Sequence, residues 1–505
     1  MRPDRIHELL SQSAKHFPDR PALQFGATQL TYADLDDLVR SAASELSGFG
    51  VRSGDRVVSI GRNRIEDVVL LHALSHIGAW PVLTSARAAA AQLEQIVSHC
   101  APRLVVASDA VPIPVAGRAV HFSSIDVVGI LNEGVEPPEL SALDRKDDVA
   151  AVLYTSGSTG APKAAMLSHE NLVYIGTTQR TLRQYSATDK TFCPLPIAHV
   201  GALGISMCLI ASGACLYLAE RFRPDTLAAA ILEQGVTVVP GLPPLHVKFM
   251  DWVRENPGRF EAGAVRLVTT SSSALHSEVK QAVEDLYGCP LQNAYGLTEA
   301  SGVIFQVRLD QLRDDVSVGP ALPDVEARIA DADGPLGPGE HGEIQARGPN
   351  VFLGYYRDSA ATRATFTQDG WLRTGDLGYL SGQGVAYVTG RAKETIKRSG
   401  YTILPAVLEA ALQAIPGVSL AVVVSRPARF DEQVVAFVEC EAESGLDSCA
   451  VLERLSHCVA KYELPDEVRL VDHLPTLSNG KIDRVGLRRA AGEPLPHPPS
   501  ESLPA

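Results

Sequence analysis

Residues 155–163 combine serine, threonine and glycine with one lysine, a mixture that could bind phosphate. Backbone N–H groups and hydroxyls of such a loop can converge on one point, and Lys163 adds a positive charge. The spacing from Gly157 to Lys163 is not that of a Walker loop. Composition alone would fit a plain Gly/Ser linker equally well. The polar candidates in this loop are Thr155, Ser156, Gly157, Ser158, Thr159, Gly160 and Lys163.

A second candidate segment, residues 293–299, could hold a nucleobase beside a metal ion. Tyr295 offers a flat face for stacking, and Gly296 allows the backbone to approach a ligand. Thr298 can donate a hydrogen bond to a phosphate, while Glu299 can hold a magnesium ion that bridges phosphate oxygens. On its own the segment could also be an ordinary strand end.

Two further positions carry isolated charges on turns. Asp376 follows a Thr-Gly turn, where a carboxylate could accept hydrogen bonds from both hydroxyls of a ribose. It could equally satisfy its own backbone in a β-turn. Lys481 follows an Asn-Gly turn, a place where lysine is usually only solvated.

These residues must be positioned by the elements around them, and apolar runs alternate with amphipathic stretches through most of the chain. Strands are expected at residues 56–60, 80–84 and 149–154, a helix at 65–77, and a helix opening near Ser168. This alternation predicts a layered α/β protein with largely parallel sheets.

The composition and the pattern of expected elements change towards the C-terminus, which predicts more than one domain. Gly/Pro-rich turns between short strands predict a β-rich subdomain at about 316–392, inside a large N-terminal domain of residues 1–392. A small α+β domain, which the family resemblance named below implies to be mobile, is expected at 393–492, followed by a disordered, Pro/Ser-rich tail at 493–505.

Taken in order, the motifs resemble the adenylate-forming superfamily, which comprises acyl-CoA synthetases, adenylation domains of peptide synthetases and firefly-type luciferases. The chain is most similar to a free-standing acyl-CoA synthetase. The segments that carry the resemblance are residues 155–163, 293–299, 370–376, 395–401 and 474–484.

The resemblance implies a role for each matching residue. Asp376 and Arg391 would grip the ribose, Lys393 would be the hinge of the small domain, and Ser399 with Gly400 would line the tunnel for CoA. Lys481 would contact the carboxylate and the α-phosphate, where a cation offsets the charge that develops. Catalytic roles are expected for Lys481, Glu299, Thr298 and His199, and contacts to ATP or AMP also for Ser272, Asn293 and Ala294.

The acid pocket is where the sequence departs from the family. The family usually shows S-G-G-A-P-L at residues 270–275, but Ser271 and Ser272 replace both glycines. His199 matches a histidine common in activators of fatty and aryl acids, and no acidic residue between Asp189 and Glu220 could pair an α-ammonium group. A further departure, Val407 in place of a glutamate at a helix start, is interpreted as structural. The acid-pocket candidates are His199, Gly201, Ser271, Ser273 and Gly296.

Composition excludes several classes of function. The formal net charge of -14 argues against a general binder of nucleic acid or membrane surfaces. The eight cysteines show no zinc spacing and predict a reduced, cytoplasmic protein. Residues 201–219 are uncharged, but their glycines and missing flanking anchors favour a buried helix or helix–strand pair over a membrane span. His72 and His76, one helical turn apart, lack the further ligand that a metal site needs.

The leading hypothesis is an ATP- and Mg²⁺-dependent ligase. It would activate an aliphatic or aryl carboxylic acid as acyl-AMP, release pyrophosphate and transfer the acyl group to CoA. Alternatives are an adenylating enzyme that loads the phosphopantetheine of a carrier protein in trans, a luciferase-like oxygenase, and an inactive nucleotide-binding regulator. The protein would be a monomer or a homodimer.

Overall fold

The computed structural model describes residues 3–107, 113, 117–132, 149–155, 163–398, 401–428, 432–441, 444–476 and 482–492. The chain divides into two compact units. The large unit comprises Met1–Glu340, Ile344–Thr374 and Leu380–Tyr387, and the small unit His341–Glu343, Gly375–Tyr379 and Val388–Ala505. The domain boundaries expected from the sequence stay predictions.

The first sheet of the large unit has eight strands in the order β15-β14-β13-β12-β10-β11-β1-β2. Its central pairs are parallel, whereas the β1–β2 and β14–β15 pairs at its edges are antiparallel. The strands are β1 (Pro21–Phe25), β2 (Thr28–Thr31), β10 (Lys190–Cys193), β11 (Cys215–Leu218), β12 (Val238–Gly241), β13 (Leu267–Thr270), β14 (Leu291–Tyr295) and β15 (Phe305–Gln306).

The second sheet also has eight strands, in the order β18-β9-β8-β4-β3-β5-β7-β6. The β8–β4–β3–β5 pairs are parallel, and β9 and β18 extend the sheet in antiparallel fashion. The strands are β3 (Arg56–Gly61), β4 (Trp80–Ser85), β5 (Leu104–Ala107), β6 (Arg118–His121), β7 (Val128–Leu131), β8 (Val149–Thr155), β9 (Lys163–Ser168) and β18 (Gly354–Tyr355).

Helices cover both faces of each sheet, as buried parallel strands require. The largest apolar cluster joins the two sheets with α1 (Ile6–His16), α2 (Tyr32–Gly48), α3 (Ile65–Ile77), α5 (His169–Leu182) and α6 (Val200–Ser212). On the outer faces, α4 (Ala90–Cys100) packs on the second sheet, and α7 (Pro224–Gln234), α8 (Pro243–Glu255) and α9 (Ser277–Tyr287) pack on the first. The predicted layered α/β class is therefore confirmed.

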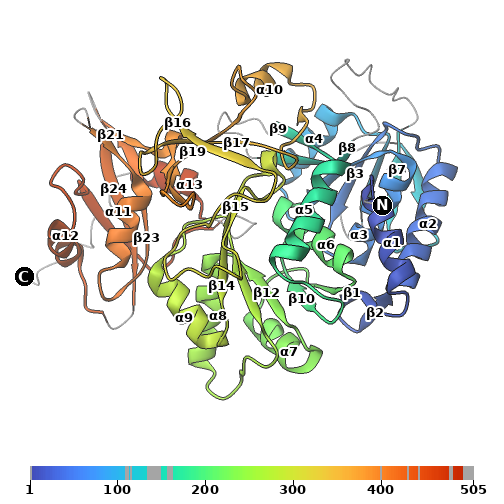
Figure 1. Ribbon diagram of the computed structural model, residues 1–505, viewed down its shortest axis with the longest axis horizontal. Helices are drawn as coiled ribbons and strands as arrows, with labels where there is room; N and C mark the ends of the chain where they lie inside the picture. Colours follow the sequence, from blue (N-terminus) through green and yellow to red (C-terminus); the bar gives the residue numbers. More distant parts are fainter. Residues whose placement is uncertain are drawn as a thin grey trace, which may run out of the picture. The chain divides into compact units, whose positions relative to one another are not determined.

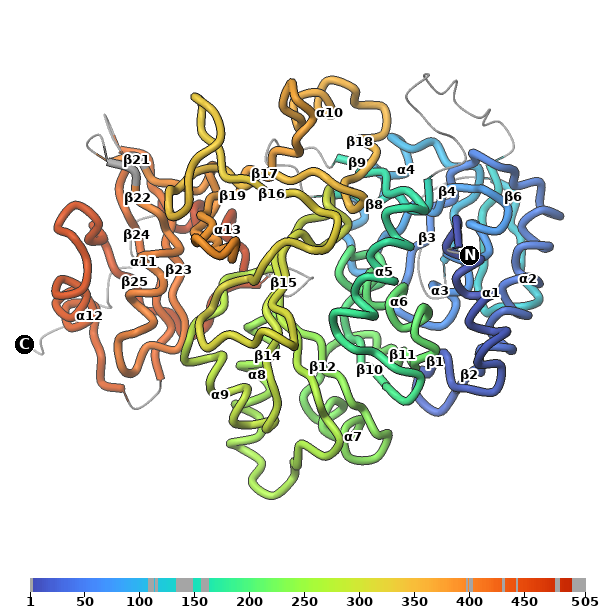
Figure 2. The backbone as a smooth tube through the Cα atoms, in the orientation of Figure 1, coloured from blue at the N-terminus to red at the C-terminus, as the bar shows by residue number. Residues whose placement is uncertain are grey.

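The local sequence explains where α5 begins and why α6 is buried. Ser168 caps α5 by accepting from the Asn171 N–H at 3.0 Å, while the Asn171 side chain accepts from the Ser168 N–H at 2.8 Å. Helix α6 is apolar on all sides and is buried beside α5 (Figures 1 and 2). The uncharged segment at 201–219 is thus a buried helix followed by β11, and none of the described helices is long and apolar enough to cross a membrane.

A separate four-stranded sheet follows in the chain, in the order β16-β17-β19-β20. Its members are β16 (Glu326–Ala330), β17 (Gly342–Arg347), β19 (Leu372–Leu380) and β20 (Ala386–Arg391), and α10 (Ser359–Thr365) lies between β18 and β19 in sequence.

The small unit has its own core around a three-stranded sheet, in the order β23-β24-β25. Within it, Glu409 is buried, accepts from the Val423 N–H at 2.7 Å and pairs with Arg484 at 2.7 Å. Val407 lies exposed near the start of α11, and the interpretation of that departure stays a prediction. The elements are β21 (Ile396–Arg398), β22 (Tyr401–Ile403), α11 (Pro405–Gln413), β23 (Val418–Pro427), β24 (Glu432–Cys440), α12 (Ser448–Ser456), β25 (Glu467–Val471) and α13 (Arg484–Ala491).

Candidate active site

Two predicted site residues of the large unit, Lys163 and Glu299, meet Tyr355 where β9, β18 and the turn after β14 come together. The Tyr355 hydroxyl donates to Glu299 Oε1 at 2.6 Å. Lys163 Nζ lies over the Tyr355 ring, 5.0 Å from the ring centroid, in a cation–π contact. The lysine of the first motif and the glutamate of the second are thus joined through one aromatic side chain, which places a cation and a carboxylate next to each other.

The backbone fixes this arrangement. Residues 354–355 pair with β9 in antiparallel register, with Tyr355 opposite Ala165, two residues beyond Lys163. Glu299 belongs to a short 3-10 helix, Thr298–Ala300, and its carbonyl accepts from the Phe352 N–H at 3.0 Å. Both ends of the Tyr355–Glu299 hydrogen bond are therefore held by main-chain hydrogen bonds as well.

Tyr355 is a donor at neutral pH. Burial, and then the nearby Glu299 carboxylate, raise the pKa of the Tyr355 hydroxyl above its ordinary value. The tyrosine therefore keeps its proton and offers it to Glu299, which leaves the other carboxylate oxygen for a ligand. Tyr355 was not among the residues predicted from the sequence. The Gly-Tyr-Tyr sequence at residues 354–356 was its only signal.

The predicted residues of β14 alternate in direction along the strand, so that Ala294 points to the face opposite that of Asn293 and Tyr295. Tyr295 lies 6.2 Å from Phe305, ring centroid to ring centroid, and Asn293 donates through Nδ2 to the carbonyls of Val316 and Ser317 at 3.0 and 3.2 Å. Asn293 therefore uses its amide N–H groups to hold a neighbouring segment. Ala294 is buried on the opposite face, across from Gln306 in β15.

Gly296 is required by the protein itself. A Cβ atom at this position would lie 2.4 Å from the carbonyl oxygen of Gly302, so no side chain fits there. A Cβ on Gly302 would in turn meet Val200 Cγ2 at 3.4 Å, which places the start of α6 beside this turn. The sequence predicted a close approach of a ligand at Gly296, and the described contact is with backbone.

His199 caps α6. Its Nδ1 accepts from the Gly201 N–H at 3.3 Å, so the proton of the neutral ring is on Nε2. A Cβ on Gly201 would meet only the His199 ring, at 3.5 Å or beyond. These two acid-pocket candidates therefore lie together at the start of α6, next to Gly302 and the turn that holds Gly296.

The serine loop after β13 is open to solvent. Ser272 and Ser273 are exposed, and the hydroxyls of Ser271 and Ser272 lie 3.4 Å apart. Ser272 has φ +71°, in the left-handed region that favours glycine.

We expect Ser272→Gly to raise the free energy of unfolding by up to about 1 kcal/mol, because glycine removes the left-handed strain at some entropic cost. Adenylation should persist with a shifted ranking of acids. Urea denaturation and an acid panel measure the two effects. Ser273→Gly is the matched control, because Ser273 is not at positive φ and its replacement should not stabilise the protein. An unchanged ranking in Ser272→Gly would mean that this hydroxyl plays no part in acid choice.

The small unit brings another predicted pair together. Arg391 Nε lies 3.0 Å from Asp376 Oδ1, and the Asp376 carboxylate is buried whereas the arginine side chain is 61% exposed. The ion pair holds a carboxylate in a fixed orientation, as ribose recognition would require. Lys393 lies exposed in a short 3-10 helix, Ala392–Glu394, directly after this arginine.

Several predicted residues lie outside the described residues, and their roles stay predictions. Of the first motif, the structure describes only the two ends, Thr155 and Lys163, which are paired across the antiparallel β8 and β9. The positions outside are Ser156, Gly157, Ser158, Thr159, Gly160, Ser399, Gly400 and Lys481.

The two histidines of α3 have different surroundings, because His72 is buried and His76 is exposed. His72 is fully buried in α3, and burial lowers its pKa to about 3, so its ring is neutral. The ring of His76 lies 5.1 Å from that of His7. Among the described residues, no group of three His, Cys, Asp or Glu side chains could hold a metal ion.

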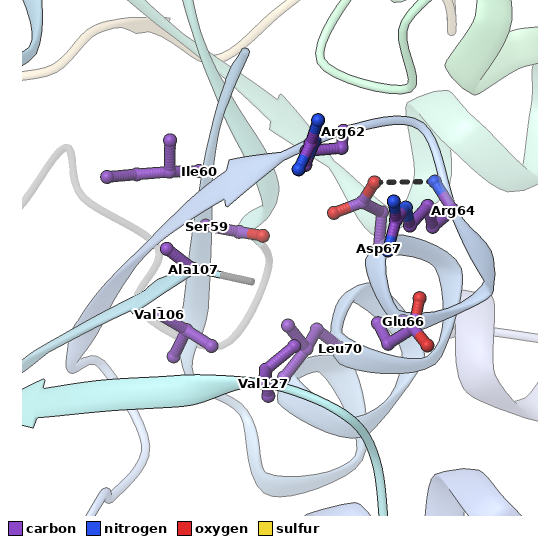
Figure 3. A pocket seen from close by; sticks show the side chains of 10 residues that line it. All are labelled: Ser59, Ile60, Arg62, Arg64, Glu66, Asp67, Leu70, Val106, Ala107 and Val127. Carbon is purple, nitrogen blue, oxygen red and sulfur yellow. Dashed lines mark hydrogen bonds between the residues drawn. The ribbon is translucent and has the colours of Figure 1, made fainter. Parts of the chain in front are cut away.

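Figure 3 shows a small pocket at the carboxyl ends of β3 and β5 that contains none of the predicted site residues. The Arg64 N–H donates to the Asp67 carboxylate at 2.9 Å, and burial raises the pKa of Asp67 to about 6. Glu220 is shared by two arginines of this pocket, at 3.7 Å from Arg62 and 2.6 Å from Arg64.

Comparison with known proteins shows the family of the chain. Residues 10–356 match the AMP-binding enzyme family, and residues 407–481 match the AMP-binding enzyme C-terminal domain. The chain belongs to the AMP-binding enzymes. An indoleacetate–CoA ligase of Aromatoleum aromaticum is 32% identical, with 96% of this chain and 98% of that protein covered. A 4-coumarate-CoA ligase of Narcissus pseudonarcissus is 30% identical, with coverage of 97% and 94%.

Solved structures give the same result. The ATP-bound MatB of Rhodopseudomonas palustris superposes on this AMP-binding enzyme with a TM-score of 0.82, 26% identity, and coverage of 96% of this chain and 98% of that one. The family resemblance inferred from the motifs is confirmed.

Tyr355→Phe tests the new member of the site. Loss of a hydrogen bond to a charged group costs about 1.5–3 kcal/mol, so we expect kcat of the adenylation half-reaction to fall about 10-fold or more. The magnesium concentration for half-maximal rate should rise, because Glu299 is no longer held. Tyr356→Phe is the matched control, since the Tyr356 ring packs edge-on against Trp80 at 5.8 Å. Equal magnesium dependence in the two variants would contradict the role of Tyr355.

Proposed function

We propose that this AMP-binding enzyme is an acid–thiol ligase that activates a small carboxylic acid with ATP and transfers the acyl group to CoA. The observation that carries the proposal is the junction of Lys163, Tyr355 and Glu299 in a chain that is similar to CoA ligases over nearly its whole length.

The first step needs positive charge near the phosphates. A carboxylate oxygen of the acid attacks the α-phosphorus of ATP, the bond to the bridging oxygen breaks, and pyrophosphate leaves with its electron pair. Lys163 supplies a cation at the start of β9, and Lys481 would supply a second one. A Mg²⁺ ion would neutralise phosphate charge, and the Glu299 carboxylate oxygen not used by Tyr355 fits it as a ligand.

Orientation is the task of the remaining side chains. Tyr295 would stack on the adenine, and the Asp376 carboxylate, oriented by Arg391, would accept hydrogen bonds from the ribose hydroxyls. His199 and Gly201 would border the acid at the start of α6. In the second step the thiol of CoA attacks the acyl carbonyl and AMP leaves, with Ser399 and Gly400 expected at the tunnel.

The relatives that act on indoleacetate and 4-coumarate favour an aryl acid as substrate. All eight cysteines are free, which supports a reducing, cytoplasmic location. No observation favours a carrier protein over CoA as the acceptor. The protein would be a monomer or a homodimer, and light scattering distinguishes the two.

The test measures pyrophosphate release from ATP with a panel of aliphatic and aryl acids, each with and without CoA. We expect ATP- and acid-dependent release, and formation of acyl-CoA when CoA is present. A carrier protein with its phosphopantetheine arm is the comparison acceptor. Release with every acid at the rate of the acid-free blank would refute the proposal.

A further inference from the structure

A histidine of α4 packs against the second sheet from behind the candidate active site. His99 is partly buried, and its Nδ1 lies 2.8 Å from the hydroxyl oxygen of Tyr154 in β8. Its ring also meets the rings of Tyr154 and Tyr356 edge-on, with the ring centroids 5.8 Å apart in both pairs. One side chain of α4 therefore contacts the end of β8 and the residue that follows β18.

Strand register shows that the two tyrosines share one face of the sheet. Tyr154 is opposite Ala164 in β9. Tyr355 is opposite Ala165, so Tyr356 comes next to Ala164, and its N–H donates to the Ala164 carbonyl at 2.8 Å. Opposite residues of antiparallel strands project from the same face. Tyr154, Ala164 and Tyr356 therefore form one row across three strands, and all three pack in the apolar cluster under α4.

The site residues come one position away in the same strands. Lys163 precedes Ala164 in β9, and Tyr355 precedes Tyr356. Because side chains alternate along a strand, both project to the opposite face, where Tyr355 packs in the largest apolar cluster and donates to Glu299 at 2.6 Å. A shift of β18 or β8 against β9 would thus change the cation–π contact and this hydrogen bond together.

Arg357 fastens the end of α4 to the same segment. Its Nη1 donates to the His99 carbonyl at 3.0 Å, and its guanidinium carbon lies 5.2 Å from the centroid of the Tyr356 ring. Carbonyls in the last turn of a helix lack partners within the helix, and a cation suits them. The four residues His99, Tyr154, Tyr356 and Arg357 are called here the His99 clamp.

The hydrogen bond at the centre of the clamp joins two uncharged groups. Burial raises the pKa of the Tyr154 hydroxyl above its ordinary value. Burial, and then the charge of Arg357, lower the pKa of His99. Tyrosine and histidine are therefore both neutral at pH 7, and each can fill the role that the other leaves open, as donor or as acceptor.

We propose that His99 is a positioning residue for the adenylation step. The inference rests on the proposed function. The clamp holds β8 and β18 on the two sides of β9 and thereby fixes Lys163 relative to Tyr355, which in turn orients Glu299. His99 would touch none of the substrates and would act only through the strands, because small displacements of catalytic groups are enough to slow a reaction.

The test compares two half-reactions of the full-length protein, namely acyl-AMP formation from ATP and an acid, and thioester formation from supplied acyl-AMP and CoA. His99→Leu should lower kcat of the first about 5- to 10-fold and raise the magnesium concentration for half-maximal rate. The second should stay within about twofold of wild type, because pyrophosphate has already left. His99→Asn, which keeps an acceptor near the position of Nδ1, should regain part of the rate. Equal losses in both half-reactions would overturn the inference, because the clamp would then only pack the core.

Two further variants refine the test. Tyr154→Phe removes one hydroxyl and keeps the ring, so the fold is retained, and adenylation should slow about threefold to fivefold. A rate equal to that of wild type overturns the inference. Gln95→Leu is the matched control, because Gln95 is exposed on the same helix, and it should leave both half-reactions unchanged.

Hydrogen exchange gives a reading that needs no substrate. The N–H groups of Leu353 and Tyr356 donate to carbonyls of β9 at 3.0 and 2.8 Å. In His99→Leu they should exchange about fivefold faster or more than in wild type and Gln95→Leu. Unchanged exchange in this segment overturns the inference, whether or not any acid is activated. Absence of pyrophosphate release with every acid of the panel refutes the proposed function instead.

Discussion

Glu299→Gln is expected to slow adenylation about 100-fold, equivalent to about 2.7 kcal/mol, while ATP binding weakens by much less. Glutamine keeps the shape and can still accept from Tyr355, but it loses the charge that suits a magnesium ligand. Single-turnover formation of acyl-AMP and separate ATP titration measure the two effects. Equal turnover of variant and wild type at saturating magnesium would refute the assignment.

A double variant sharpens this result. Tyr355 is proposed to act only through Glu299, so Glu299→Gln combined with Tyr355→Phe should be about as slow as Glu299→Gln alone. Additive losses would mean that Tyr355 has an independent contact with the substrates. Tyr356→Phe in the Glu299→Gln background is the control for any general effect of removing a hydroxyl here.

The sequence predicted the elements well where apolar periodicity was strong. The helix expected at residues 65–77 is α3 with the same bounds, and the run at 201–219 is buried as expected. Both follow from local pattern, because an apolar stretch needs only a core to cover it.

Long-range relations could not be predicted in this way. Tyr355 and Glu299 are far apart in sequence, and only the pairing of β18 with β9 brings the hydroxyl to the carboxylate. At Gly296 the sequence predicted the close approach of a ligand, whereas the close approach of Gly302 is visible only in three dimensions.

The last expected result concerns Lys481 and Lys393. Lys481→Ala should lower acyl-adenylate formation about 10²–10³-fold, the usual cost of removing a group that stabilises developing charge. The variant should still convert supplied acyl-AMP and CoA to the thioester, because Lys481 is proposed to enter the site only for the first step. The small domain would then withdraw it and present Ser399 and Gly400 to the thiol.

Lys393→Pro should give the opposite pattern. Proline fixes φ at the proposed hinge and should slow the thioester step more than adenylation if it holds the adenylating pose. Both half-reactions are measured on both variants, with circular dichroism as the check on folding. A crossed pattern supports alternation about Lys393. If folded Lys481→Ala loses both steps equally, one fixed arrangement must perform both reactions, and the hinge has no catalytic role.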